Sequence, residues 1–259
     1  MKISIKTIFP FFLYAVIAAG FYWLINDKYT VPVMMYHNVA ESPEFRDDTV
    51  SLANFERHLQ FLQKRGYRVI SANDLANGIK SGKHFPRNSV VITFDDGNEN
   101  NYTAAFPLLR EYGYAADFFI SPGTIGTEGA LTWDDVLRMH LGGMRFGSHG
   151  MIQAYLPDVS NEKQLYEILE SKRILEQKLK APVEYYAYPI GGFNEEIKKL
   201  LRDSGYKGAF TTNRGTDRFD KDVYEINRIR FGDHDTSDLI LAAKLSGYYN
   251  MFRKLKKSY

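Results

Sequence analysis

The 259-residue sequence contains no cysteine, and this absence removes several kinds of chemistry at once. Without thiols there is no disulfide framework, no cysteine nucleophile and no thiolate zinc site, so any metal must be bound by histidine, carboxylate or amide groups. The chain also lacks an excess of one charge, because 33 basic and 31 acidic residues give a net charge of +2. No basic stripe or recognition motif accompanies that balance, so nucleic acid is not an expected partner.

Linkers, internal repeats and low-complexity segments are missing as well. With 44% apolar residues, a chain of this length can bury one large core. Composition therefore excludes a disordered protein, and no boundary between two globular domains is visible.

The single long apolar run is Thr7–Ile25, which follows Lys2 and Lys6 and ends in aromatic residues. Its length of about 19 residues is near that needed to span a bilayer. We interpret residues 1–28 as an uncleaved signal anchor whose basic end stays in the cytoplasm, which places the rest of the chain in the periplasm or outside the cell. The alternative is a signal peptide cleaved after 18–20.

The stretch Ser89–Gly97 reads SVVITFDDG, and the rest of the chain is organised around it. Its apolar part, Val90–Phe94, is too short for a helix and too apolar for an exposed edge, which predicts a buried central strand. Asp95 and Asp96 follow at once. Adjacent carboxylates at a strand end repel each other unless a cation, a proton or hydrogen-bond donors compensate, so the pair indicates chemistry. The alternative is an ordinary Asp-Asp-Gly turn.

Strand and helix patterns alternate about seven times, and each connection is long enough for a crossover. This pattern predicts a parallel sheet closed or nearly closed into a barrel. The predicted strands are Val31–His37, Arg68–Ser71, Val90–Phe94, Ala115–Ser121, Arg145–His149, Val183–Tyr188, Gly208–Thr212 and Val223–Phe231. The predicted helices are 52–65, Asn73–Ser81, Asn101–Tyr112, 132–141, 160–180, Asn194–Asp203 and Ser237–Leu245.

Two of these helices carry specific expectations. Pro107 lies inside the pattern of Asn101–Tyr112, so that helix should start late or be kinked. Ser160 should cap the long helix. The apolar face of the long helix is expected to consist of Leu165, Ile168, Leu169, Leu175 and Leu179.

Four polar clusters come directly after predicted strands. They are Tyr36-His37, Asp95-Asp96, Ser148-His149 and Pro189–Gly192. In parallel barrels the carboxyl ends of the strands share one face, which is where active sites lie. We therefore expect the four clusters to meet.

In this order the clusters resemble the polysaccharide deacetylase family, also called the NodB-homology or carbohydrate esterase 4 family, and within it the poly-β-1,6-N-acetylglucosamine deacetylases. The motifs are MMYHNV at 34–39, TFDDG at 93–97, GSH at 147–149 and AYPIGGFN at 187–194. The resemblance covers roughly 31–230. It implies that residues 29–259 form a distorted (β/α)7 barrel that removes acetyl groups from an acetylated polysaccharide, using a zinc-like divalent metal (Zn, Co or Ni).

Residue roles also follow from the resemblance. It implies that Asp95 is the general base and that Asp96 and His149 are metal ligands. The backbone N–H of Ile190 matches the donor that stabilises the tetrahedral intermediate, and His37 matches the general acid. For His37 the alternative is a histidine satisfied at a strand end.

One position departs from the family pattern. A second metal histidine normally stands four residues after the first, and here that position is Gln153. An amide oxygen is a poorer ligand than imidazole for zinc-like ions, so we expect Asp96 and His149 with Gln153 as a weak third ligand. His234 follows the last strand and is a further candidate. The remaining histidines, which we expect at the surface, are His58, His84 and His140.

The base-orienting arginine of the family is also absent from its usual motif. Arg228 or Arg230, on the last predicted strand, is a candidate replacement, and a structural salt bridge is the alternative. Tyr188, Pro189 and Trp133 are candidate substrate contacts, although aromatic residues on strands are more often core.

Three functions remain open at this point. The first is a hydrolase of the acetamide bond in a GlcNAc-containing polymer. The second is a carbohydrate-binding pseudoenzyme with a degraded metal site, which Gln153 favours. The third is an esterase acting on O-acetyl groups with the same residues.

Overall fold

The computed structural model describes residues 28–42, 48–212 and 219–253, together with the single positions 14, 16, 17, 20 and 26. Most of the proposed signal anchor Thr7–Ile25 therefore lies outside the described residues. Among the residues that are described, none belongs to a helix with the length and apolarity needed to cross a bilayer.

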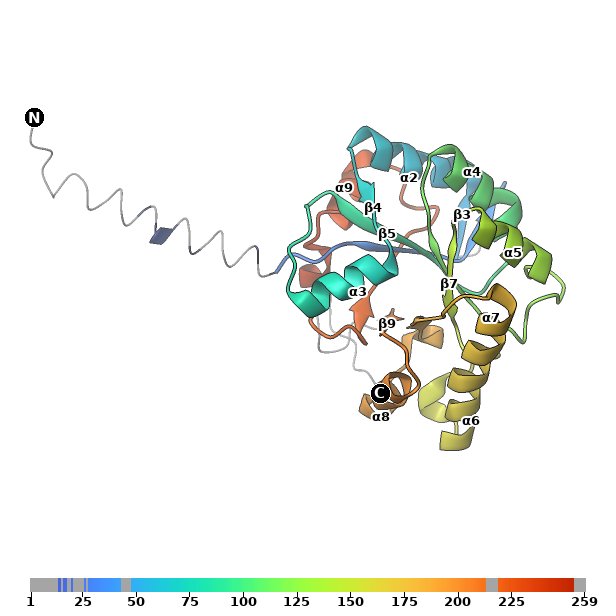
Figure 1. The fold of residues 1–259 in the computed structure, drawn as a ribbon. Helices are drawn as coiled ribbons and strands as arrows, with labels where there is room; N and C mark the ends of the chain where they lie inside the picture. The colour runs from blue at the N-terminus through green and yellow to red at the C-terminus, as the bar shows by residue number, and fades with distance from the viewer. Residues whose placement is uncertain are drawn as a thin grey trace, which may run out of the picture.

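A parallel sheet forms the centre of the molecule and curves into a nearly closed barrel with helices around it (Figure 1). The strand order is β10-β9-β8-β7-β6-β5-β1-β11, with β4 paired to β5 beside this path. A separate parallel pair joins β2 to β3. The strands are β1 (Val33–Tyr36), β2 (Asn38–Ala40), β3 (Thr49–Ser51), β4 (Arg68–Val69), β5 (Ser89–Phe94), β6 (Asp117–Ile120), β7 (Arg145–Ser148), β8 (Tyr185–Ala187), β9 (Gly208–Thr211), β10 (Ile226–Asn227) and β11 (Ile229–Arg230).

The two edges of the sheet meet through one short segment. The sequence pattern predicted a single strand over Val223–Phe231, but the structure divides it into β10, which pairs with β9, and β11, which pairs with β1. The division arises because β9 and β1 are opposite edges of the sheet, so the chain must step from one to the other. Arg228 is the residue at the step, and its N–H donates to Thr211 O at 3.1 Å.

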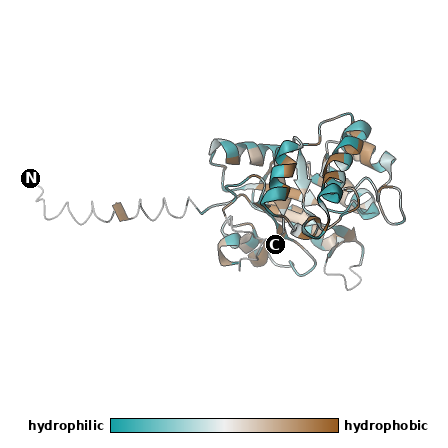
Figure 2. Ribbon diagram, turned by 90° about the horizontal axis from the view of Figure 1, so that it is seen from below, coloured by the Kyte–Doolittle hydropathy of each residue, from teal (hydrophilic) through white to brown (hydrophobic). Residues whose placement is uncertain are grey.

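Helices cover the outside of the barrel, and most start where a side chain accepts a hydrogen bond from the first turn. Ser51, Ser71, Thr132, Ser160, Asn194 and Ser237 all act in this way. Figure 2 shows hydrophilic and hydrophobic residues alternating along these outer helices, as expected for helices with one face on a core. The α-helices are α2 (Leu52–Lys64), α3 (Ala72–Ser81), α4 (Phe106–Glu111), α5 (Trp133–Leu141), α6 (Asn161–Leu165), α7 (Ser171–Leu179), α8 (Glu195–Asp203) and α9 (Asp238–Lys244). Short 3-10 turns are η2 (Leu156–Asp158), η4 (Pro189–Gly191) and η5 (Tyr249–Phe252).

Two of the predicted helices contain a π-helical turn. The late start of the α-helix expected from Pro107 is confirmed, whereas the buried face expected for the long helix is not. The first, η1 (Asn101–Ala105), precedes α4, so Pro107 falls in the first turn of α4, where its missing N–H is harmless. The second, η3 (Tyr166–Glu170), joins α6 to α7 and shifts the register of the long helix. Leu165 and Leu169, expected on the buried face, are 41% and 45% exposed.

Aromatic side chains fill the barrel behind the central strand. Phe94 stacks between Tyr36 and Phe118, with ring centroids 5.3 and 4.8 Å away. His58, expected at the surface, is buried against this group because its ring nitrogens contact Tyr36 Oη at 2.9 Å and Asp235 O at 2.8 Å. The prediction for His58 was therefore wrong, since a histidine with both nitrogens paired can be buried on a helix face.

Candidate active site

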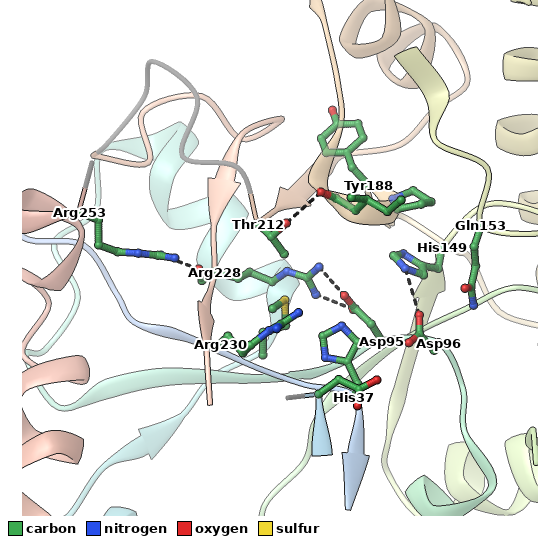
Figure 3. Close-up of a pocket in the computed structure, with 14 residues that line it drawn as sticks. His37, Asp95, Asp96, His149, Gln153, Tyr188, Thr212, Arg228, Arg230 and Arg253 are labelled. Atoms are coloured by element: carbon green, nitrogen blue, oxygen red, sulfur yellow. Dashed lines mark hydrogen bonds and ion pairs between the residues drawn. The ribbon is translucent and has the colours of Figure 1, made fainter. Parts of the chain in front are cut away.

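A cavity of about 630 Å³ opens where β1, β5, β7 and β8 end, and the polar clusters of the sequence meet there (Figure 3). Parallel strands deliver these side chains to one edge because β1 and β5 pair in register, with Tyr36 opposite Phe94. The expected site residues that line the cavity are His37, Asp95, Asp96, His149, Gln153, Tyr188, Pro189, Ile190, Arg228 and Arg230.

Asp95 is held by Arg228 through two parallel hydrogen bonds. Arg228 Nη1 and Nη2 donate to the two carboxylate oxygens of Asp95 at 2.6 Å each, and both side chains are buried. Burial by itself would raise the pKa of Asp95, but the charge and hydrogen bonds of Arg228, with His149 nearby, keep it below its usual value. Asp95 is thus an ionised, oriented carboxylate at the cavity wall.

Asp96 faces His149 rather than Arg228. His149 Nδ1 lies 2.8 Å from Ala187 O, and its Nε2 lies 3.5 Å from Asp96 Oδ1. In the neutral imidazole, Nδ1–H donates to this carbonyl, so the Nε2 lone pair is on the side of Asp96, where a cation between the two would meet both groups. Burial lowers the pKa of His149, but the charges of Asp95 and Asp96 outweigh burial and raise it. The two adjacent aspartates therefore have different partners, which resolves their mutual repulsion.

Backbone strain is concentrated at this cavity. The described residues contain five non-glycine residues with positive φ, and three of them, Asp96 (73°), Gln153 (62°) and Ile190 (56°), line it. Each such conformation costs about 1–3 kcal/mol unless the surroundings fix it. Ile190 is 74% exposed, and its N–H has no acceptor among the described residues. That N–H is therefore free to donate to a ligand.

The loop between His149 and Gln153 is fixed by a buried carboxylate. Glu167 Oε2 accepts hydrogen bonds from the backbone N–H groups of Met151 at 2.6 Å and Ile152 at 2.9 Å, and Glu167 is fully buried on η3. Sequence reasoning missed this residue. No signal in the sequence pointed to it, because Glu167 lies off the expected apolar face and the π-helical turn η3 brings it to the buried side.

His37 is positioned through its carbonyl oxygen. Asn101 Nδ2 donates to His37 O at 2.7 Å, and Asn101 is fully buried on the other π-helical turn, η1. Burial lowers the pKa of the His37 ring below its usual value; Asp95 and Asp96 oppose this effect, and Arg228 and Arg230 add to it. The His37 ring, beside the aspartate pair, therefore releases its proton at a lower pH than a free imidazole.

The candidate substrate contacts divide into those inside and outside the cavity. Pro189 and Tyr188 line it, but the Tyr188 ring is buried and its hydroxyl donates to Tyr224 O at 3.0 Å, so the ring has no exposed face for a sugar. Trp133 does not line the cavity, and Lys178 lies over its ring at 5.2 Å. His234 is exposed and is not part of the lining.

Arg230 and Arg228 are both in the cavity but differ in their contacts. Arg230 is exposed, and its guanidinium has no hydrogen-bond or ion-pair partner within the described part of the chain. Figure 3 places Arg230 beside His37, with Arg228 between it and Asp95. Of the two arginines, Arg228 is the one placed to orient the carboxylate of Asp95.

The side chains of Asp96 and His149 fit a zinc-like divalent cation. Two ligand atoms of a tetrahedral zinc ion are roughly 3.4 Å apart, close to the Asp96–His149 separation of 3.5 Å. The carbonyl at His149 Nδ1 is the outer partner that metal-bound histidines need. Within the described residues no third histidine or carboxylate joins them. Gln153 lies beside the pair in Figure 3, so the groups available to such a cation are one carboxylate, one imidazole and one amide.

The comparisons with known proteins agree with one another on a single family. Residues 82–209 match the sequence model of the family described as Polysaccharide deacetylase. The Bacillus subtilis protein YxkH is 29% identical over 209 residues, covering 80% of this chain and 74% of that protein. The poly-beta-1,6-N-acetyl-D-glucosamine N-deacetylase of Staphylococcus aureus is 25% identical over 215 residues, covering 78% of this chain and 74% of that protein.

A solved structure supports the same fold. The Streptococcus pyogenes deacetylase PplD in complex with acetate superposes with a TM-score of 0.77 at 27% identity, covering 83% of this chain and 97% of that chain. The superposition covers nearly all of that chain, so the nearly closed parallel barrel seen here is a fold that a known deacetylase also has.

Proposed function

We propose that this chain, whose residues 82–209 match the polysaccharide deacetylase family, is a hydrolase that removes N-acetyl groups from a GlcNAc-containing polysaccharide. The observation that carries the proposal is the separation of the adjacent aspartates. Asp95 is ionised and oriented by Arg228, whereas Asp96 faces His149 across a gap of ligand size. A carboxylate that takes a proton and a carboxylate that binds a cation are the two that amide hydrolysis by water requires.

Each residue then has a distinct task. Asp95 takes the proton of the water that attacks the acetyl carbonyl, and Arg228 keeps its oxygens aimed at the cavity. The N–H of Ile190 donates to the oxygen that becomes negative in the tetrahedral intermediate. His37 in its protonated form donates to the nitrogen of the leaving amine. The released products are acetate and a free amino sugar, so atoms and protons balance.

A zinc-like cation belongs to this proposal. Asp96 and His149 would hold it with Gln153 as a weak third ligand, and when bound it supplies polarisation of the carbonyl and a lower pKa for the attacking water. Because one ligand is an amide, we expect a weaker site than one with two imidazoles.

The decisive test is acetate release from β-1,6-linked and β-1,4-linked GlcNAc oligomers, measured with added Zn²⁺, Co²⁺ or Ni²⁺. We expect release by the wild type and release that is lower by about 10²–10⁴-fold by Asp95→Asn. An O-acetylated sugar serves as the competing substrate, and release from it alone would identify an esterase. Release of acetate by Asp95→Asn at the wild-type rate would remove Asp95 from the mechanism.

A carbohydrate-binding protein without turnover is the second candidate. Gln153 favours it, because the described residues offer only one histidine and one carboxylate to a metal. Binding of GlcNAc oligomers with no acetate release under any of the three metals would establish this alternative.

We also propose that Thr7–Ile25 holds the domain at the membrane, with the barrel outside the cytoplasm. The proposal rests on the apolar length of this run and on basic residues before it. The test is the N-terminal sequence of the membrane-associated protein from cells. A mature soluble chain beginning near residue 21 would show that the segment is a cleaved signal.

A further inference from the structure

Basic side chains gather at the end of the barrel opposite the candidate active site, where the strands begin. Residues 57–94 contain seven lysines and arginines but one carboxylate, Asp74. The loops that enter β4 and β5 lie in this range, and they bring Arg65, Lys83 and Arg87 to the amino-terminal end of the sheet. We refer to this surface, together with Lys80 and Lys221, as the basic face; all five side chains are exposed.

Contacts show that the basic face is continuous. Arg65 and Arg87 line one shallow cavity, and Lys83 and Lys221 line a second. Asn26 joins the two, because it lines the second cavity and accepts a hydrogen bond from Arg87 at 2.5 Å.

The two cavities are lined by a single acidic residue. This residue is Asp220, which is buried and accepts hydrogen bonds from the backbone and side-chain nitrogens of Asn227. Positive charge therefore dominates the exposed lining.

The chain that follows the apolar run enters the barrel through this face. Tyr29 Oη lies 3.5 Å from Pro86 O, Thr30 N donates to Gly247 O at 2.9 Å, and Arg87 reaches Asn26. The orientation of a membrane segment depends on the lysines and arginines that lie close to it in sequence. Arg65, Lys83 and Arg87 are too far from Thr7–Ile25 to belong to that group. Folding nevertheless places them beside the residues that directly follow the run.

We propose that the basic face docks on the surface of an anionic bilayer, with the catalytic cavity directed away from it. The proposal rests on the membrane anchoring proposed above, since a short tether at Asn26 holds this end of the barrel near the lipid. Lysine and arginine clusters next to a membrane segment attract anionic headgroups over about one Debye length. Tyr29 and Phe85 at the same face add the aromatic groups that favour the interface.

The absence of native cysteine makes the orientation measurable. One full-length variant carries Ser81→Cys at the end of α3 on the basic face, and another carries Glu128→Cys in the loop after β6, at the catalytic end. Each is labelled with a fluorescent donor and reconstituted into phosphatidylcholine vesicles with or without phosphatidylglycerol, both containing an acceptor on the lipid headgroups. Energy transfer then reports how close each end of the barrel lies to the bilayer.

With phosphatidylglycerol present, we expect transfer from position 81 to exceed that from position 128 by about threefold. In high salt, in phosphatidylcholine alone and in the Arg65→Glu/Lys83→Glu variant, the excess should fall to the smaller value that the tether alone gives. The matched control is Arg173→Glu/Lys178→Glu, which changes the charge equally on α7 and should leave the excess intact. An excess that is no larger with phosphatidylglycerol than with phosphatidylcholine alone, in vesicles that retain the chain, would overturn docking and leave the anchor standing.

Other outcomes also decide the question. Flotation only with phosphatidylglycerol vesicles would support docking and refute the anchor, and flotation with neither kind would refute both. If soluble polyphosphate removes the excess at an ionic strength where chloride does not, the basic face binds an anionic polymer and the docking proposal fails. Acetate release from a soluble oligomer is expected to be unchanged in the Arg65→Glu/Lys83→Glu variant, which separates this test from that of the catalytic proposal.

Discussion

Within the described part of the barrel, two aspartate–arginine pairs with a buried carboxylate lie at opposite ends of the strands; Arg228 is buried with its aspartate, whereas Arg145 is partly exposed. At the carboxyl end, Asp95 is bound by Arg228 with two contacts of 2.6 Å. At the amino end, Asp117 is bound by Arg145 with contacts of 2.8 and 2.9 Å, and it also accepts from Ala72 N at 3.2 Å. The pairs are alike in chemistry and in their bidentate geometry.

Their surroundings differ in the number of unsatisfied groups. Asp117 accepts three hydrogen bonds and thereby ties β6 and β7 to the start of α3. Asp95 has Arg228 as its partner, borders a wide cavity and stands next to Asp96, which is strained. The Arg228 Nε atom is also buried without a partner among the described residues. Asp117 and Arg145 also border a cavity, but a smaller one of about 140 Å³. A pair whose hydrogen bonds are satisfied stabilises the fold, whereas a pair with an unpartnered buried N–H and a strained neighbour beside a wide cavity is available for chemistry.

The largest effect is expected when the aspartates of the two pairs, Asp95 and Asp117, are replaced in separate variants. Asp95→Asn should reduce acetate release by about 10²–10⁴-fold with metal content nearly unchanged, because the base is lost and the ligands remain. Asp96→Asn should lose both. Asp117→Asn should keep turnover within about twofold while lowering the free energy of unfolding by about 1–3 kcal/mol. The checks are initial rates, metal analysis and thermal unfolding; a reversal between Asp95 and Asp117 would contradict the comparison.

A second effect is expected from the residue that fixes the loop behind the metal pair. Glu167→Gln keeps an acceptor oxygen but loses the charge that binds the N–H groups of Met151 and Ile152. We expect metal affinity to fall by about tenfold, measured by titration calorimetry, as for other partners that position metal ligands. The control is Lys163→Gln, which removes the ion pair with Glu167 and spares the loop bonds, so affinity should not change. An equal loss in both variants would assign the effect to the helix as a whole.

Much of the barrel was predictable because its signals are local. The strand β5 and the capped helices α5 and α8 lie within a residue or two of the predicted bounds, since apolar runs and capping side chains act over a few residues. The division of the last strand at Arg228 was not predictable, because it depends on which sheet edges must meet. The buried face of the long helix was missed because a π-helical turn shifts a register that pattern counting assumes to be constant.

For the site, residue identities were predictable and their partners were not. The motifs brought His37, Asp95, Asp96 and His149 to one cavity, as the strand-end argument expected. The sequence could not tell whether Arg228 or Arg230 binds Asp95, because this depends on how the last strand closes the barrel. Trp133 was misplaced because an aromatic residue at a helix start gives no indication of which side of the barrel it covers. Their chemical roles stay predictions.

A third, smaller effect concerns the amide at the metal pair. Gln153→His replaces an amide oxygen by imidazole, which borderline metals prefer. We expect metal affinity to rise by at least about tenfold, or roughly 1.4 kcal/mol. Acetate release at limiting metal should rise with it, whereas Gln153→Asn, which keeps the amide, should give no gain. Unchanged affinity in the histidine variant would show that another group already completes the site.

The smallest effect concerns Arg230, the second arginine of the catalytic cavity, and its influence on the pKa of His37. Arg230 and Arg228 both lower the pKa of His37, and burial is the largest cause of that lowering. Removing the charge in Arg230→Gln therefore raises the His37 pKa, so the protonated ring persists to higher pH. If His37 is the general acid, kcat/KM falls as pH rises through its pKa, and this alkaline limb should move to higher pH in the variant. Rates on the plateau should change by less than about twofold.

Arg253→Gln is the matched control, since Arg253 lines the same cavity but is not among the groups that shift the pKa of His37. An alkaline limb that stays in place in Arg230→Gln, or moves equally in both variants, would exclude His37 as the acid and direct the search to another proton donor at the cavity.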